Sequence, residues 1–418
     1  MWLSALYCAP LPRKGKGPGH GGGLYPELAV FGFHSGQSAA LSSRVARQTT
    51  LMPSFELARQ ELARDGVKLN IKVVHRSTHR LGERLLIARR CDLERYRNGQ
   101  LPAGTQAAGK RIVAQLDGGR VRLRKVTRKQ KGEGNKKKQK RRYKGQWREP
   151  KLLTVFEIDN KGQRVRTSRA RIDGTFCGPG EVMELLAMHL HRLGAAQAEV
   201  VVLLADGAPW IWERLEWVVG RVGLGEEQWQ WVLDFWHAAQ HVSAALAHVP
   251  IEAKQRRRLY RKLRKWMLGG KAWEVTRELR RLGQEHGVEV AMEADLAYLE
   301  KHEDSCRMDY ARYRQRGLPI GSGAVESAIR RVINLRVKGP GLLWYEHNAE
   351  GMILLRAAAL TGRWQELVDN VRQRFSTDRR IDLKWASPDL RAQLQADAEI
   401  QPPSPQVKES QQPSRRVA

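Results

Sequence analysis

The chain has 418 residues, more than one hydrophobic core usually organises, so we expect two or three domains. Its 74 Lys and Arg outnumber 44 Asp and Glu, which gives a formal net charge of +30, while 41% hydrophobic residues are enough for folded cores. This charge predicts a polyanionic partner, and because no apolar run approaches the roughly 20 residues of a membrane-spanning helix, nucleic acid is a better candidate than a membrane.

The N-terminal part is expected to hold a flexible lead-in and a helical domain. Residues 1–24 are Gly-rich and basic, and ordering them would cost much backbone entropy. Residues 25–108 follow as a helical DNA-binding domain. Within them, Ser54 can cap a helix that Asp65-Gly66 ends, and Asn70 can cap a second helix. Two helices around a tight turn over 54–90 predict a helix-turn-helix-like unit.

The second of these helices has an apolar face and a basic face. Its inward residues are expected to be Val74, Thr78, Leu81 and Leu85. Its outward residues include Lys72 and the three expected to contact DNA, which are Arg76, His79 and Arg80. An ordinary helical hairpin with a basic face is the alternative.

Three apolar segments of strand length come next, and they predict an antiparallel meander that begins an α/β core. They are residues 111–117, 151–158 and 163–172. Residues 120–151, between the first two, hold 16 Lys or Arg against two Glu. We interpret this segment as a mobile basic hairpin arm on DNA phosphates rather than a solvated loop. The arm residues assigned to DNA are Lys136, Lys137, Lys138, Lys140, Arg141 and Arg142.

The pattern then alternates between helices and strands. A helix over 180–193, a buried strand over 200–205, a helix from Trp210 and a strand over 229–233 complete the order β-β-β-α-β-α-β. The expected fold is therefore a mixed α/β sheet, whose first part spans 109–240.

The rest of the chain is expected to divide into three parts. Residues 241–316 read as an all-helical insertion, and the core resumes over 317–395 with C-terminal helices. The proline-rich, polar tail 396–418 is expected to be disordered.

Two acids end apolar strands and are each followed by glycine, namely Asp117 and Asp206. Carboxylates at strand ends open onto the crevice of an α/β sheet and are hard oxygen ligands suited to Mg²⁺. A plain Asp-Gly turn is the alternative reading of each. Asp159 also follows an apolar strand and is the second choice for the first ligand, although Asn160 and Gly162 suggest a turn there.

A third acid lies in the segment GLPIGSGAVESA, residues 317–328. Ser322 can cap a helix that carries Glu326 in its first turn, where an acid is also favoured by the helix dipole alone. Asp234, at the end of the strand 229–233, could replace one of the other carboxylates.

Four segments together resemble the transposases of ISKra-type insertion sequences. They are WREPK (147–151), ADGAPWIW (205–212), LDFWHAAQH (233–241) and GLPIGSGAVESAIRRVINLRVKGPG (317–341), and the resemblance covers most of residues 25–370. It implies a ribonuclease H-like catalytic core interrupted by a helical insertion before the last acid. It also implies that Asp117, Asp206 and Glu326 are a DDE triad and that Asp234-x-x-His237 resembles a C/D-x-x-H element of related transposases.

The resemblance implies cleavage of DNA and joining of the freed 3′-hydroxyl to target DNA. Two Mg²⁺ or Mn²⁺ ions would be held by the triad and Asp234. The implied partners are double-stranded DNA and further copies of the chain, as a homodimer or higher oligomer on DNA. After the last acid, Arg336 and Lys338 are expected to contact DNA, and Trp344 to stack on an unpaired base.

Three alternatives to this function stay open at this point. A ribonuclease H-like nuclease or resolvase without strand transfer would use the same carboxylates, and a decayed copy or a non-enzymatic protein would only bind DNA. The four cysteines lie far apart without C-x-x-C spacing, and the N-terminus lacks the pattern of a signal peptide. We therefore expect a bacterial cytoplasmic, nucleoid-associated protein.

Overall fold

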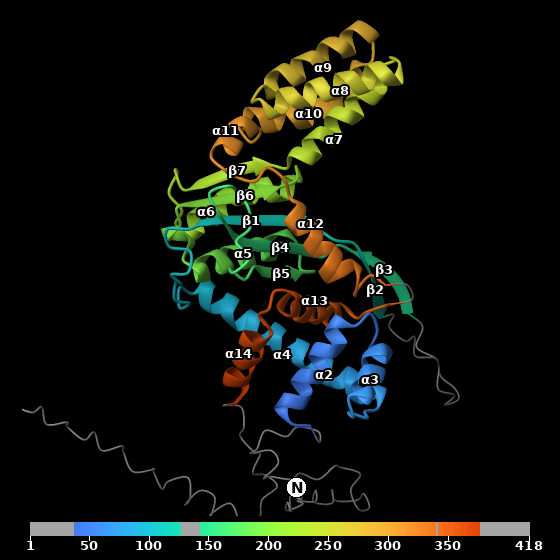
Figure 1. Ribbon diagram of the computed structural model, residues 1–418, viewed down its shortest axis with the longest axis vertical. Coiled ribbons are helices and arrows are strands. Elements are labelled where there is room, and N and C mark those ends of the chain that lie inside the picture. The colour runs from blue at the N-terminus through green and yellow to red at the C-terminus, as the bar shows by residue number, and fades with distance from the viewer. Residues whose placement is uncertain (1–36, 127–142, 340–341, 377–418) are drawn as a thin grey trace, which may run out of the picture. The chain divides into compact units, whose positions relative to one another are not determined.

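The computed structural model describes residues 37–126, 143–339 and 342–376, and nearly all of these belong to one unit, Ala40–Arg374 (Figure 1). Its N-terminal helices are α2 (Ala39–Leu51), α3 (Phe55–Arg64) and α4 (Ile71–Arg97). Both predicted caps are confirmed, because Ser54 Oγ accepts from the backbone N–H of Leu57 and Asn70 Oδ1 from that of Lys72. The C-cap of α3 is Asp65, as expected.

The core is a mixed five-stranded sheet in the order β5-β4-β1-β6-β7. Its strands are β1 (Arg111–Gly118), β4 (Lys151–Ile158), β5 (Arg171–Thr175), β6 (Val200–Ala205) and β7 (Trp229–Leu233). The first three pair antiparallel, whereas β1, β6 and β7 run parallel. The prediction of an α/β core with a mixed sheet is thus confirmed.

The third strand differs from its predicted place. It begins at Arg171 and not at residue 163, and residues 159–170 form turns with a single bridge between Ile158 and Arg164. The reason is burial. Every residue of β5 is buried, whereas the preceding stretch is polar and mostly exposed. The alternation in 163–172 therefore did not indicate a strand.

The segment between β1 and β4 begins and ends as an antiparallel hairpin. Its strands are β2 (Val121–Val126) and β3 (Tyr143–Arg148). Val121 and Leu123 are buried, so the base of the predicted arm is packed and is not a free loop. Residues 127–142, which include the six arm residues assigned to DNA, lie outside the described residues.

Helices cover both faces of the sheet (Figure 1). On one face lie α5 (Pro179–Leu193) and α6 (Pro209–Val222), packed on Leu116 and Leu153. On the other lie α12 (Gly323–Ala328), the π-helical segment η2 (Ile329–Asn334) and α13 (Glu346–Leu360), packed on Leu152. A short 3-10 segment η1 (Ala195–Gln197) precedes β6.

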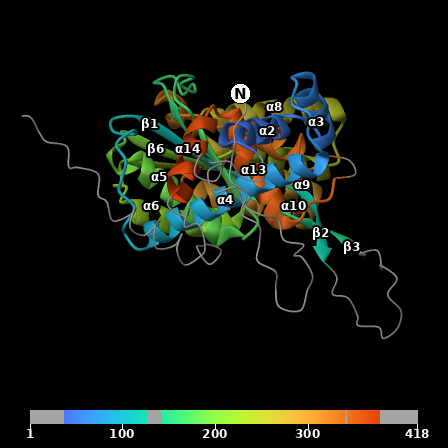
Figure 2. The ribbon, with the colours of Figure 1, turned by 90° about the horizontal axis from the view of Figure 1, so that it is seen from below.

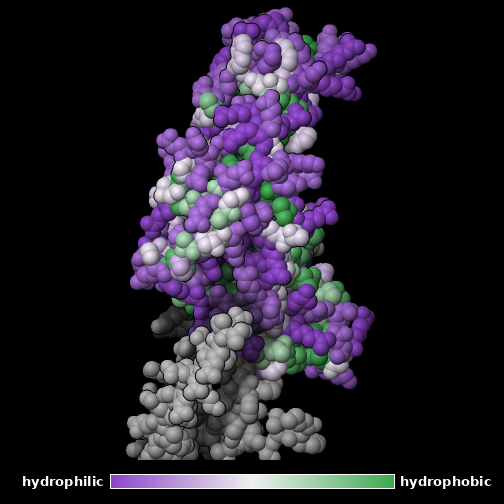
Figure 3. All heavy atoms as spheres, turned by 60° about the vertical axis from the view of Figure 1, so that its left-hand side comes forward, coloured by the Kyte–Doolittle hydropathy of each residue, from purple (hydrophilic) through white to green (hydrophobic). Residues whose placement is uncertain are grey.

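A helical block stands between β7 and α12 in the chain, as predicted for an insertion. It consists of α7 (Phe235–His248), α8 (Ala253–Leu268), α9 (Ala272–His286), α10 (Glu289–Asp304) and α11 (Tyr310–Gln315). The surface in Figure 3 is mainly hydrophilic over this block, with only scattered hydrophobic side chains. Its first helix begins directly after β7, so the block starts earlier than residue 241.

The N-terminal helices and the C-terminal part of the core meet where α4 runs beside α13 (Figure 2). The two backbones approach at a pair of glycines, because a Cβ on Gly82 would lie 3.3 Å from Gly351 Cα. The last described helix is α14 (Trp364–Ser376). Among all these helices, in the parts of the chain that the structure describes, none is long and apolar enough to cross a membrane.

Candidate functional site

Three acids stand side by side where the parallel strands end. Asp117 lies near the end of β1, while Asp206 and Asp234 directly follow β6 and β7. Leu116 pairs with Ala205 and Ala205 pairs with Leu233, so each acid comes one residue after this row. The register therefore brings the predicted Asp117 and Asp206 to one edge of the sheet, with Asp234 beyond them.

Glu326 reaches this edge because helix α12 is fastened to β1 by Gln115. The Gln115 side chain is buried, and its Nε2 donates to the carbonyl of Gly321 at 3.2 Å. Its Oε1 accepts from the backbone N–H of Val325 at 3.0 Å. Sequence reasoning missed Gln115, although a single amide inside the apolar strand RIVAQLD was a signal for a buried polar contact.

Asp234 is a hydrogen-bond acceptor that joins two segments. Its Oδ1 accepts from the backbone N–H groups of Trp236 and His237, and its Oδ2 accepts from that of Ser322. Although burial raises its pKa, bonds from His237 and Ser322 outweigh this and lower the pKa to about 2. The carboxylate is 0% exposed. Its oxygens are thus already engaged in fixing α7 against the loop before α12.

His237 lies close to both Asp234 and Glu326. Its Nδ1 is 3.5 Å from Asp234 Oδ1, and one ligand atom of each of the three residues lies within 4.8 Å of the others. Its pKa is raised chiefly by Asp234, and the charges of Asp206 and Asp117 add to this. The imidazole is 35% exposed, so it can still meet a ligand from solvent.

The pKa of the Asp117 carboxyl is changed by its burial and by the charges of the other groups in the site. Burial raises its pKa to about 6, and the charges of Asp206 and Glu326 act in the same direction. A hydrogen bond from the Gly118 N–H and the charge of His237 act against them. The site thus holds several carboxyls whose mutual repulsion a bound cation would relieve.

The glycine after Asp206, Gly207, is required by a contact that the sequence could not reveal. A Cβ on Gly207 would lie 1.9 Å from Cε2 of Tyr298, so the ring of this α10 residue rests on the backbone there. Tyr298 also stacks on His241 at 3.6 Å between ring centroids. The helical block therefore contacts the site directly, and Gly207 does more than permit a turn.

Two local expectations are corrected. Ser322 is the N-cap residue of α12 but forms no side-chain cap; its Oγ instead donates to Glu326 Oε1 at 2.8 Å. Asp159, the second choice for the first ligand, follows Ile158, which pairs with the first residue of β1. It therefore lies at the opposite end of the strand from Asp117, about 20 Å away, and its Oδ1 accepts turn N–H groups from Lys161 and Gln163.

Three residues assigned to DNA are instead part of a packed aromatic group. Arg336 is 0% exposed and its guanidinium lies over the rings of Phe55 and Trp344 at 4.9 and 5.2 Å. Trp344 is 6% exposed, and the partly buried His79 ring also packs on Phe55. The expectation of a surface role is wrong for Arg336 and Trp344, because α3 covers them.

The other residues assigned to DNA are placed as follows. Arg76 and Lys338 are exposed, and Arg80 is partly exposed on α4. These positions are compatible with contact to a partner, whereas His79 is turned toward the aromatic group. Burial is the largest cause of its pKa falling to about 4, so it is neutral at pH 7.

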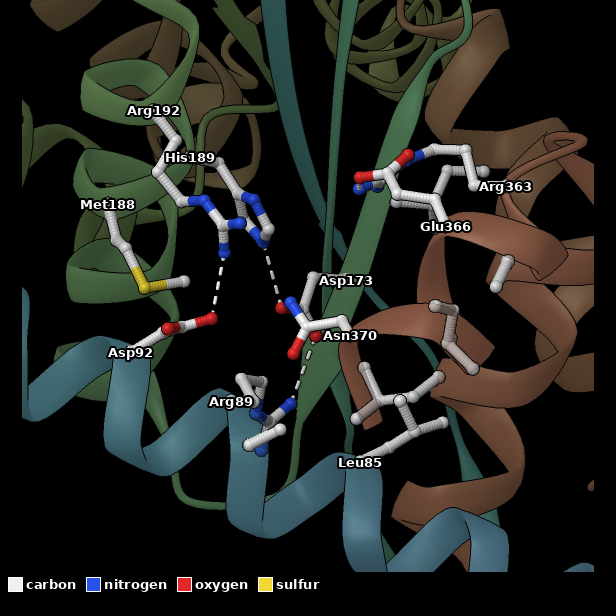
Figure 4. Close-up of a pocket in the computed structure, with 15 residues that line it drawn as sticks. Leu85, Arg89, Asp92, Asp173, Met188, His189, Arg192, Arg363, Glu366 and Asn370 are labelled. Atoms are coloured by element: carbon white, nitrogen blue, oxygen red, sulfur yellow. Dashed lines mark hydrogen bonds and ion pairs between the residues drawn. The ribbon is translucent and has the colours of Figure 1, made fainter. Parts of the chain in front are cut away.

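A cavity of about 120 Å³ lies away from the carboxylates, between α4, α5, β5 and α14 (Figure 4). Its charged groups pair with one another. Arg89 and His189 contact Asp173 at 3.0 and 2.9 Å, and Arg192 contacts Asp92 at 2.8 Å. These ion pairs join α4 to the sheet and to α5, and they leave the buried Nδ1 of His189 without a hydrogen-bond partner among the described residues.

Comparisons with protein-family models, curated proteins and solved structures find no match for this chain. The case for a function therefore depends on the geometry of the strand-end acids and on the sequence motifs.

Proposed function

We propose that the chain is a DDE-type DNA transposase with a ribonuclease H-like core, in which Asp117, Asp206 and Glu326 are the catalytic carboxylates. One observation carries this proposal. Two acids end the adjacent parallel strands β1 and β6, and the helix that carries a third acid, more than 100 residues later in the chain, is bonded to β1 through Gln115. The strand order β5-β4-β1-β6-β7, with the helical block before Glu326, supports it.

The donor set fits divalent metal ions. Carboxylate oxygens are the hard ligands that Mg²⁺ and Mn²⁺ prefer, and Asp117 and Asp206 are only partly buried while Glu326 is exposed. Asp234, with both oxygens engaged, fits better as a residue that positions the others. When bound, two such ions supply activation of the attacking oxygen and stabilisation of the leaving oxygen in an in-line displacement.

The remaining residues of the site hold the catalytic carboxylates in place or carry a positive charge. Gln115 and Asp234 fix the loop before α12 from two sides, so Glu326 keeps its place relative to Asp117. Asp234 raises the pKa of His237, which favours the protonated imidazole. In this form His237 can donate a hydrogen bond to a phosphate oxygen. In this scheme water attacks a phosphodiester first, and the freed 3′-hydroxyl attacks target DNA next.

The experiment uses a supercoiled plasmid that carries the reading frame with its flanking DNA, incubated with the full chain and Mg²⁺. We expect cleaved and joined products, and a loss of at least about 100-fold for Asp206→Asn and Glu326→Gln. Asp159→Asn, in the turn after β4 at the opposite edge of the sheet, is the matched control and should retain activity. Cleavage without joined products would favour a nuclease or resolvase, and unchanged cleavage by Asp206→Asn would reject the proposed centre.

A further inference from the structure

The charges in the helical block are divided unevenly among its helices. Helix α8 holds eight Lys or Arg and no acid, whereas α9 holds three Arg and three Glu. Helix α10 holds six acids and one Lys. Because the whole block is exposed to the same solvent, a need for solubility alone does not explain why one helix is purely basic.

Two of the three arginines of α9 are neutralised within the block. Arg280 pairs with Glu300 at 2.5 Å, and Arg281 pairs with Glu278 at 2.9 Å and with Glu285 at 2.5 Å. On α8 the situation is different. Among the described residues, only Lys262 of this helix has an acidic partner, Glu278 at 3.8 Å.

Of the seven cations of α8 that have no acidic partner among the described residues, four exposed ones form one stripe, defined here as Lys254, Arg258, Arg261 and Lys265. Their spacing of four, three and four residues puts them on one face, opposite the buried Leu263 and Met267. The stripe is about 16 Å long, a length over which one strand of a duplex presents about five phosphates. Its period and charge therefore match a nucleic-acid backbone.

The C-terminal end of α8 lies close to the strand-end acids. The Arg264 guanidinium stands 5.0 Å from the ring of Trp236, which is 54% exposed and lies between Asp234 and His237. A Cβ on Gly321 would touch the same tryptophan ring at 3.3 Å. The stripe thus begins beside the site and runs outward along the block.

We infer that the α8 stripe is a binding surface for the phosphate backbone of duplex DNA on its way to the carboxylate site. The position of the DNA relative to the site rests on the proposed function, whereas the phosphate contact itself does not. An acidic protein is the weaker candidate, because protein interfaces need an apolar centre and α8 has no large hydrophobic side chain among those exposed in the described chain.

The test compares two double variants with the same change in charge. Arg258→Gln with Arg261→Gln removes two stripe cations, and Arg280→Gln with Arg281→Gln removes two paired cations from α9. Binding of the full chain to a random-sequence duplex is measured in EDTA over a range of salt concentrations. The stripe variant should reduce the slope of log affinity against log salt by about 1.8, or about 0.9 per lost contact, whatever the DNA sequence. The α9 variant should keep the wild-type slope.

Either an unchanged slope in the stripe variant or an equal change in both variants would overturn the inference. Arg258→Lys with Arg261→Lys keeps the charge and should keep the slope, so a fall there would show that folding and not charge had changed. Because EDTA prevents cleavage, the result does not depend on catalysis. If the slope result holds while Asp206→Asn still cleaves DNA, the proposed function fails and the α8 surface stands.

Discussion

The amide of Gln115 holds the start of α12, the helix that carries Glu326: its Nε2 donates to the Gly321 carbonyl and its Oε1 accepts from the Val325 N–H. Replacement by Leu would remove the donor to the Gly321 carbonyl and one of the two acceptors of the Val325 N–H, which would keep only its bond to the Ser322 carbonyl. We expect Gln115→Leu to lower the free energy of unfolding by about 1–3 kcal/mol and to reduce DNA cleavage much further than that loss of folding explains. Urea unfolding and plasmid cleavage measure the two effects.

The matched control for Gln115 is Thr154, which stands opposite it on β4. Thr154 is buried, and its hydroxyl makes no hydrogen bond within the described residues. Thr154→Val should therefore leave cleavage unchanged. Equal activity of Gln115→Leu and Thr154→Val would remove the positioning role from Gln115.

His79 gives a pH dependence of stability. Burial lowers its pKa to about 4, against about 6.5 in an unfolded chain. Between these values the unfolded state binds a proton that the folded state does not, so stability must fall as the pH drops from 6.5 toward 4. His79→Gln should show a smaller difference in unfolding midpoint between pH 7 and pH 5 than the wild type. An identical difference would show that His79 does not titrate in this way.

For single residues, the sequence predicted the strand-end acids but not the residues that hold them in place. Asp117 and Asp206 could be predicted because each follows an apolar run directly, and this pattern can be recognised from a few neighbouring residues. The contacts of Gln115 with Gly321 and of Gly207 with Tyr298 join residues far apart in the chain. Such contacts depend on the register of the whole sheet, so no local pattern could show them. The burial of Arg336 under Phe55 was missed for the same reason.

At the scale of elements, the capping signals of Ser54 and Asn70 were reliable, whereas that of Ser322 and the alternation over residues 163–172 were not. Ser54 and Asn70 start their helices through their own side chains, which is a local effect. The strand β5 was displaced because burial, not alternation, decided where it begins. Helix α12 is short and passes into a π-helical segment, a geometry that the sequence pattern of a regular helix does not predict.

The junction between α7 and the α12 loop depends on Asp234. In Asp234→Asn, a side-chain NH₂ group would face the Ser322 N–H in place of Oδ2, or the bonds to Trp236 and His237 would be lost. We expect a loss of about 1–3 kcal/mol in unfolding free energy, measured by urea titration.

His237→Ala should leave stability nearly unchanged and reduce strand joining. Full strand joining by His237→Ala would exclude that residue from the site.

At the scale of the whole molecule, the helical block is tied to the sheet through Tyr298 and Gly207. Gly207→Ala would place a methyl group inside the Tyr298 ring, so the ring, and the α10 segment that carries it, must move. We expect lower thermal stability and weaker cleavage. Tyr298→Ala in the same chain should recover part of the stability, since the two residues are coupled. Additive losses in the double variant would show that the contact is absent.

If the strand-end carboxylates hold metal ions for DNA cleavage, as we propose, a change of ligand atom at Asp206 should change which ion supports the reaction. Asp206→Cys replaces a hard oxygen ligand with a thiolate, which Mn²⁺ accepts more readily than Mg²⁺. With the plasmid substrate, we predict that this variant is inactive in Mg²⁺ and regains cleavage in Mn²⁺, whereas the wild type cleaves in both. Equal cleavage by the variant and the wild type in Mg²⁺ would mean that Asp206 holds no metal ion that cleavage needs.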